Sequence, residues 1–275
     1  MVLSLLFEGA FDAYAEAVRR DARLWLFVHV PKTAGSSLSG ELARLAPPYH
    51  NIHIDHTDRS RPGPERFDAA VAAFLDLHRG AAQPFRSASG HILNRHMERI
   101  RAAVPGTAPV TMLRHPVSRI ISDYRYQRSP MHPLSEEVIR RAPDFDAFLD
   151  LPGPRNRMAK HLVPIEMVRK ERLRPAVNYV VERFAFAGLQ ESYDLSFRLL
   201  TALITGTPVA PTEKRRVNEE GERVTLTPEL ERKLRERNAL DFAIYEAVQV
   251  RFQAVEERLR AWLAGRAAST ARAVA

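Results

Sequence analysis

The sequence of 275 residues contains no cysteine, which excludes disulfide bonds, thiolate metal sites and a thiol nucleophile. Long apolar runs are also missing. The longest, residues 69–75, has seven residues, whereas a membrane-spanning helix needs about 20. The first residues, MVLSLLFEGAFD, have no basic start and reach Glu8 after a short apolar patch, unlike a secretory signal. We therefore expect a cytoplasmic protein without a transmembrane segment.

Lysine is scarce as well, yet the chain is basic: 41 Lys and Arg residues face 33 Asp and Glu residues, for a net charge of +8. This excess favours an anionic partner such as a phosphate or sulfate ligand, an acidic glycan, nucleic acid or a membrane surface. Arginine enrichment is also typical of a GC-rich genome. Acidic residues interrupt most basic runs, as in residues 219–237, and no nucleic-acid reader motif is present, so we expect no nucleic-acid partner.

Strand and helix patterns alternate along the chain. Short apolar segments at residues 24–30, 85–91, 109–114 and 184–189 predict buried strands, and residues 36–45, 66–78, 94–103 and 116–127 predict helices. Such alternation favours an α/β fold in which a parallel sheet is flanked by helices in three layers. We expect a single domain over residues 1–275, with a core at about 24–250.

Two proline-rich regions interrupt this pattern. Residues 129–175 predict an excursion over the site rather than a second domain, and residues 47–64 predict a surface loop. A long C-terminal helix is expected to begin at Thr227-Pro228. Its apolar stripe, with steps of three and four, runs to Trp262 and includes Asn238 and Asp241, which we expect to tie the helix to the core.

The most informative stretch is FVHVPKTAGSSL at residues 27–38, where a strand runs through small residues into a helix. Small residues let the turn bring backbone N–H groups close to an anion, and the helix adds its positive dipole end. Lysine and hydroxyl side chains supply further donors. The lysine precedes the glycine, so the spacing differs from a Walker A loop. The residues predicted to bind phosphate or sulfate are Pro31, Lys32, Thr33, Ala34, Gly35, Ser36 and Ser37.

A second anion-binding segment is VTMLRHPVSRIISDYRY at residues 110–126. A predicted strand ends at Arg114, and Pro116 begins a helix whose polar face includes Ser122. A guanidinium fork and a hydroxyl donor together suit a phosphate monoester. We therefore predict that Arg114 and Ser122 bind a second phosphate.

The two segments resemble motifs of sulfotransferases that use 3′-phosphoadenosine 5′-phosphosulfate (PAPS). The first is similar to P-K-T-[AG]-G-[ST]-[ST] of carbohydrate sulfotransferases related to heparan sulfate 2-O-sulfotransferase. The second resembles the 3′-phosphate motif R-[DE]-P-x-x-R-x-x-S-x-Y, with His115 in place of the acid and with Arg119 and Tyr124 matching. Weaker similarities occur at residues 156–162, 184–193 and 238–245. The resemblance implies a P-loop-NTPase-like sulfotransferase fold, PAPS as cofactor and PAP as product.

A general base for a hydroxyl acceptor should titrate near working pH, which favours histidine. The pair Gly90-His91 ends a predicted strand, and the resemblance implies that this histidine is the base. His96 is a weaker candidate, and His29 is interpreted as structural. His50, His53 and His56 recur every third residue; they could bind zinc, but PAPS chemistry implies no metal, so an acceptor-binding or solvated loop is the default.

These observations predict sulfuryl transfer from PAPS to a hydroxyl of a carbohydrate or glycolipid, with His91 as base and Lys32 stabilising the leaving phosphate. The acceptor is expected to contact residues 47–64 and 129–175. The alternative is a P-loop-like phosphotransferase that uses a nucleoside triphosphate. The absence of Walker A spacing, and of an evident magnesium-binding acid after a strand, argues against it.

Overall fold

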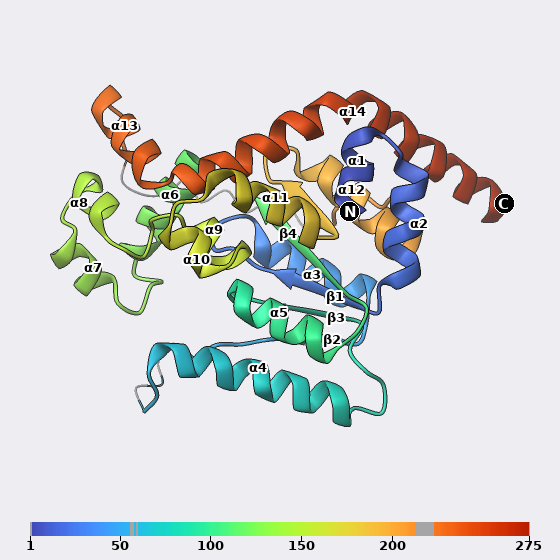
Figure 1. Ribbon diagram of the computed structural model, residues 1–275, viewed down its shortest axis with the longest axis horizontal. Coiled ribbons are helices and arrows are strands. Elements are labelled where there is room, and N and C mark those ends of the chain that lie inside the picture. Colours follow the sequence, from blue (N-terminus) through green and yellow to red (C-terminus); the bar gives the residue numbers. More distant parts are fainter. Residues whose placement is uncertain (1, 56–57, 59, 213–222, 275) are drawn as a thin grey trace.

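The computed structural model describes residues 2–55, 58, 60–212 and 223–274. Five parallel strands form one sheet in the order β2-β3-β1-β4-β5, and helices surround it (Figure 1). The strands are β1 (Leu24–Val28), β2 (Tyr49–Asn51), β3 (Ser87–Gly90), β4 (Thr107–Leu113) and β5 (Phe186–Leu189). The prediction of an α/β fold with a parallel sheet flanked by helices and a long C-terminal helix is confirmed.

The helices before and between the strands are α1 (Val2–Glu8), α2 (Phe11–Asp21), α3 (Gly35–Leu45), α4 (Gly63–Gly80), α5 (Asn94–Ala103) and α6 (Pro116–Gln127). Those that follow are α7 (Ser135–Arg141), α8 (Phe145–Asp150), α9 (Arg157–Leu162), α10 (Ile165–Arg169), α11 (Leu173–Arg183), α12 (Tyr193–Thr205), α13 (Pro228–Arg237) and α14 (Ala239–Val274). The four helices predicted between residues 36 and 127 are confirmed as α3 to α6. Within the described part of the chain, no helix has the length and apolar character needed to cross a bilayer.

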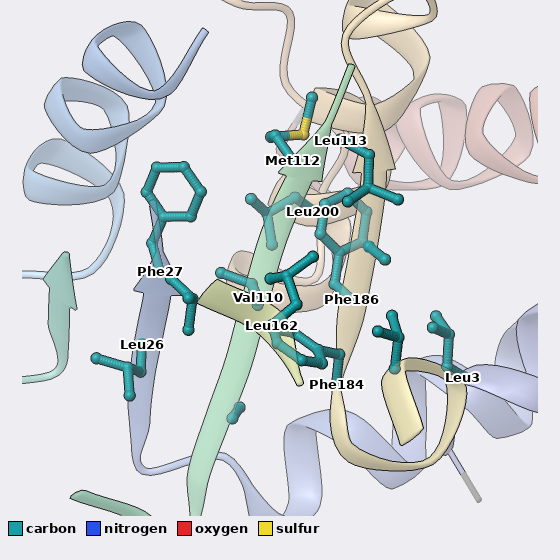
Figure 2. Packing of buried hydrophobic residues seen from close by; sticks show 14 of the residues in the cluster. Leu3, Leu26, Phe27, Val110, Met112, Leu113, Leu162, Phe184, Phe186 and Leu200 are labelled. Atoms are coloured by element: carbon teal, nitrogen blue, oxygen red, sulfur yellow. The ribbon is translucent and has the colours of Figure 1, made fainter. Parts of the chain in front are cut away.

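Strand β1 lies at the centre of the core. All five of its residues are buried because β3 and β4 flank it and helices cover the sheet. Figure 2 shows side chains of β1, β4 and β5 in one apolar cluster, with Phe27, Val110, Met112 and Phe186 among them. The near-continuous apolar character of these strands is therefore the consequence of burial on both faces.

The prediction of a surface loop over residues 47–64 is wrong for residues 49–51. Tyr49–Asn51 forms the edge strand β2, which pairs in parallel with β3, and α4 begins at Gly63. A three-residue edge strand has too few positions to show a strand pattern in the sequence. The pairing places the segment after β2 next to the carboxyl end of β3.

Residues 129–175 contain four short helices, α7 to α10, and the start of α11. Part of this region has a small apolar cluster of its own, in which Phe145 and Phe148 of α8 pack on Tyr124 of α6. Leu234 of α13 and Phe242 of α14 belong to the same cluster. The C-terminal helices therefore hold the excursion against α6.

The stripe that predicts one C-terminal helix is interrupted at Asn238, where α13 ends with a backbone φ of −127°. Beyond this break α14 runs across the molecule, past α11 and α12 to α1 (Figure 1). Two hydrogen bonds of Asn238 accompany the break: its Nδ2 group donates to the Leu234 carbonyl, and its Oδ1 accepts from the backbone N–H of Asn156. The prediction of a single uninterrupted helix is wrong, because the side chain at the break pairs with a segment distant in sequence.

The prediction that Asn238 and Asp241 tie this helix to the core is confirmed. The Asp241 carboxylate accepts hydrogen bonds from the backbone N–H groups of Met158 (3.1 Å) and Ala159 (2.8 Å), at the beginning of α9. It also lies 3.9 Å from Nε of Arg119, and both side chains are fully buried. Asp241 thus caps α9 and balances a buried guanidinium.

Replacing Asp241 by alanine is expected to lower the free energy of unfolding by about 3–5 kcal/mol, because the buried Arg119 loses one of its two carboxylate neighbours and two helix N–H groups lose their acceptor. Urea denaturation measures the loss. The matched control is Asp150→Ala, which removes an exposed carboxylate paired with Lys233 and should cost far less. Equal losses for the two variants would contradict this account of α9.

Candidate functional site

The segment between β1 and α3 has an unusual backbone. Lys32 and Ala34 have positive φ angles of 70° and 63°, although neither is glycine. Residues held in this left-handed region cost of order 1–3 kcal/mol each and cluster at ligand sites. The loop therefore turns tightly at the carboxyl end of β1, where ligands bind in open α/β sheets.

The first turn of α3 is open to a ligand. Its N-cap residue, Ala34, makes no side-chain capping hydrogen bond, so the first N–H groups of the helix have no acceptor from that side chain. Such groups form a ready site for an anion. The hydroxyl of Thr33 is buried and donates to the Val30 carbonyl (2.9 Å), so its hydrogen holds the loop and is not available to a ligand.

Gly35 is required by close packing. A Cβ atom at this position would lie 1.8 Å from Nε2 of His29, so any other residue would displace the histidine ring. Ser36 is exposed and Ser37 is half-buried on the same turn. The loop thus keeps two hydroxyl side chains accessible at the N-terminus of α3.

The second predicted segment meets the first. Arg114, directly after β4, donates from a guanidinium nitrogen to the carbonyl oxygen of Lys32 (3.1 Å). Ser122 lies on α6, half-buried, and its hydroxyl has no hydrogen-bond partner among the described residues. Arg114 therefore contacts residues 31–37, called the phosphate loop after the ligand predicted there, and Ser122 lies on α6, the helix that Lys32 approaches.

Lys32 points toward α6. Its Nζ lies 4.3 Å from the centre of the Tyr126 ring, within the range of a cation–π contact. Burial lowers the pKa of Lys32, and Arg114 adds to the effect, whereas the carboxylate of Asp123 opposes it. Tyr126 and Asp123 are functional neighbours that the sequence reasoning missed. The signal was available, since both lie within the second motif segment.

Two motif residues that match the family pattern have structural roles. Arg119 is fully buried, pairs with Asp123 (3.2 Å) and donates to the Pro154 carbonyl (3.2 Å). Tyr124 is fully buried in the cluster under α8. Both support α6 rather than contact a ligand.

His115 stands where the family motif has an acidic residue, and a carboxylate that follows another strand takes the place of that acid. The backbone N–H of His115 donates to the carboxylate of Glu191 (2.9 Å), which follows β5. The His115 ring packs edge-on against Phe242 and Tyr245 of α14. An acid is therefore still present at the start of α6, although it comes from residue 191.

His91 lies at the carboxyl end of β3, beside the phosphate loop. Its Nδ1 is 2.8 Å from the carbonyl oxygen of His29, and because a carbonyl only accepts, Nδ1 carries the hydrogen. The neutral ring therefore has its lone pair on Nε2, the tautomer that can accept a proton. The rings of His29 and His91 are 4.1 Å apart between centres.

The other histidine candidates have different surroundings. His96 is buried, and its Nδ1 accepts from the Leu93 N–H while its Nε2 contacts Asp68. His50 packs against Phe74 and Phe85. His56 lies outside the described residues, and no group of three or more metal-ligating side chains occurs within the residues that are described.

A pocket of about 360 Å³ lies between β3, the start of α3 and the segment after β2. It is on the β2 side of His91, whereas Arg114 follows β4 on the other side. Ser36 and Ser39 border it from α3, and Asn51 and His53 border it from the predicted acceptor loop. Ser39 was missed by the sequence reasoning, although its spacing of three from Ser36 puts both on one face of the helix.

Comparisons with known proteins give distant likenesses among solved structures only. No protein-family model matches the sequence, and no curated protein matches it. Among solved structures, the crystal structure of a sulfotransferase from Alicyclobacillus acidocaldarius is similar, with 20% sequence identity and a TM-score of 0.46. The likeness covers 82% of this chain and 96% of that chain.

His161 gives a pH test of the packing behind the site. Burial lowers its pKa to about 3 from an ordinary value of 6.5, while its Nδ1 donates to the Ile92 carbonyl. Below pH 6.5 the unfolded chain binds a proton that the folded chain does not, so stability falls as pH falls through this window. His161→Asn, which can keep the donor, should remove up to about 1.4 kcal/mol of this loss per pH unit. Urea denaturation of both proteins between pH 7 and 5 measures it; parallel slopes would contradict the burial of a neutral ring.

Proposed function

We propose that this chain transfers the sulfuryl group of PAPS to a hydroxyl group of a carbohydrate or glycolipid. The observation that carries the proposal is the hydrogen bond from Arg114 to the Lys32 carbonyl. It joins two anion-binding segments, which lie 82 residues apart in sequence, at one edge of the sheet. His91 lies at the same edge, two strands away from β4 across β1. A doubly anionic ligand and a proton acceptor are thus supported together.

The residues present fit PAPS. The open first turn of α3 and the packing of His29 over Gly35 leave backbone donors for a 5′-phosphosulfate. Arg114 and Ser122 would hold the 3′-phosphate through a guanidinium and a hydroxyl. Pro31, Thr33 and Ala34 would contribute backbone shape and Ser36 and Ser37 hydroxyl donors. When bound, PAPS supplies the sulfuryl group, and PAP is the product.

His91 would take the proton of the acceptor hydroxyl on Nε2 as the hydroxyl oxygen bonds to sulfur and the bond from sulfur to the phosphate oxygen breaks. The hydrogen bond from Nδ1 to the His29 carbonyl fixes the ring and its tautomer. A fixed backbone acceptor needs no reorganisation during the reaction. His29 therefore acts on His91 through its backbone oxygen.

Lys32 would neutralise charge that grows on the departing phosphate oxygen. Its ammonium group rests over the Tyr126 ring near Asp123, so it is held close to the loop by weak attraction. The N–H groups at the start of α3 act in the same sense through fixed dipoles. Charge stabilisation and proton removal thus come from separate elements.

Replacing Lys32 by alanine should weaken PAP binding roughly 10- to 150-fold, the equivalent of about 1.5–3 kcal/mol for one charge-assisted hydrogen bond. Calorimetric titration with PAP measures it, with Lys170→Ala as control because Lys170 is exposed and outside the site. ATP, which has no 3′-phosphate for Arg114, should bind more weakly than PAP. Absence of PAP binding, or ATP binding as tight as PAP, would refute the proposal and favour a phosphotransferase.

Replacing His91 by asparagine should lower kcat by about 10²–10⁴-fold and leave PAP affinity unchanged, because asparagine can keep the bond to the His29 carbonyl but has no base. PAP release from PAPS with a mixture of methyl glycosides and glycolipids measures the rate. His78→Asn, on α4 away from the site, is the matched control. An unchanged rate in the His91 variant would exclude it as the base.

A further inference from the structure

The pocket beside His91 has a chemical character of its own. Among the described residues, ten line it, and none of these is Lys, Arg, Asp or Glu. Since 27% of the chain is charged, a typical set of ten would include more than two charged side chains. Within the part of the chain that the structure describes, Lys32 and Arg114 thus lie on the side of His91 away from this pocket.

This distribution of charged side chains disfavours an acceptor whose reacting unit carries an acidic group. A carboxylate or sulfate moved from water into a pocket without a cation loses its hydration and gains no ion pair. The pocket volume of about 360 Å³ lies near the lower end of the range for small-molecule sites, about 300–1,000 Å³. It suits one compact uncharged group.

Hydroxyl groups form the polar wall. Tyr49 of β2 and Ser39 of α3 each contact the buried Ser89 hydroxyl, at 2.7 Å and 2.9 Å. Each hydroxyl can donate and accept, so the chain of three can reverse its direction to suit a ligand. Asn51, at the end of β2, adds an amide that also offers both roles.

His29 supplies a polar group that lacks a partner. The residue is half-buried and borders the pocket, its ring lies 4.1 Å from that of His91 between centres, and among the described residues neither ring nitrogen has a hydrogen bond. Burial keeps the pKa of His29 well below its ordinary value, so the ring is neutral. A neutral imidazole has one donor and one acceptor. An alcohol group can serve either nitrogen.

The opposite wall is apolar. Ile52 and Ile54 are buried and border the pocket, and Ile52 approaches β3 so closely that a Cβ on Gly90 would lie 2.6 Å from its carbonyl oxygen. A sugar ring has polar edges and apolar C–H faces. The two walls match these two kinds of surface.

We propose that the acceptor pocket, formed by His29, Ser39, Tyr49, Asn51 and Ile52 around His91, binds an uncharged sugar unit and discriminates against a uronic acid. This inference rests on the proposed function and names the acceptor class of the same site. It departs from the acidic glycan that the basic composition of the chain would favour.

The test uses matched pairs of probes on the full chain saturated with PAP. Methyl glucoside and methyl glucuronide differ only in the carboxylate, as do methyl galactoside and methyl galacturonide. Ligand-observed NMR measures binding, and sulfation with PAPS gives kcat/KM for the same probes. We expect the neutral member of at least one pair to bind and to react, with its acid counterpart weaker by about tenfold or more.

The variant Asn51→Arg tests whether the charge of the pocket sets the preference for neutral glycosides over uronides. Asn51 is exposed at the pocket edge, so a guanidinium there should strengthen uronide binding and shrink the preference. The control Gln83→Arg adds the same charge at an exposed position before β3, at the opposite end of that strand, and should leave the preference unchanged.

Two results would overturn the inference while the proposed function stands. One is binding of uronides as tight as that of the neutral glycosides or tighter; the other is PAP binding with no affinity for any neutral glycoside. Failure of the native protein to bind PAP would instead remove the proposed function, and the inference with it. The PAP titration therefore separates the two failures.

Discussion

The parallel pairing of β1 with β3 on one side and β4 on the other is the constraint on which the site depends. Parallel strands end at the same edge of a sheet, so this pairing gathers three loops that are distant in sequence. The loop after β1 carries Lys32, the loop after β3 carries His91, and the loop after β4 carries Arg114. Hydrogen bonds from side chains to backbone carbonyls then fix their relative positions: the Lys32 carbonyl accepts from Arg114, and the His29 carbonyl accepts from His91.

This geometry divides the site into two electrostatic halves. Lys32 and Arg114, with the open end of α3, make the β4 side suited to anions. On the β2 side, the described residues that line the pocket carry no permanent charge and offer hydroxyl, amide and imidazole groups. His29 marks the boundary, because its ring packs over Gly35 of the phosphate loop and also borders the pocket. In the proposed reaction, the donor phosphates and the uncharged acceptor would meet at this boundary.

Behind the site, a buried polar network secures the excursion. The backbone N–H of Asn156 donates to Oδ1 of Asn238, and Oδ1 of Asn156 accepts from the backbone N–H of Leu240. Asp241 caps α9, and Arg119 neutralises part of the buried charge. Such groups are costly to bury without partners, so they specify how α6, α9 and α14 meet. The small apolar cluster around Phe148 then packs on this frame. The network explains why several motif residues are needed for architecture rather than for ligand contact.

The sequence by itself determined the main strands and the helices from α3 to α6, because apolar periodicity and small-residue turns act over a few neighbouring residues. It also identified the two segments that we propose to bind anions. It also indicated that Asn238 and Asp241 face inward. It did not determine the edge strand β2, the break between α13 and α14, the burial of Arg119 or the contact of Lys32 with Tyr126. The tertiary structure alone decided these, since each depends on a partner far away in sequence: β3 for β2, Asn156 for the helix break and α6 for Lys32. Local patterns fix which elements form, whereas the partner that a polar side chain meets depends on how those elements pack.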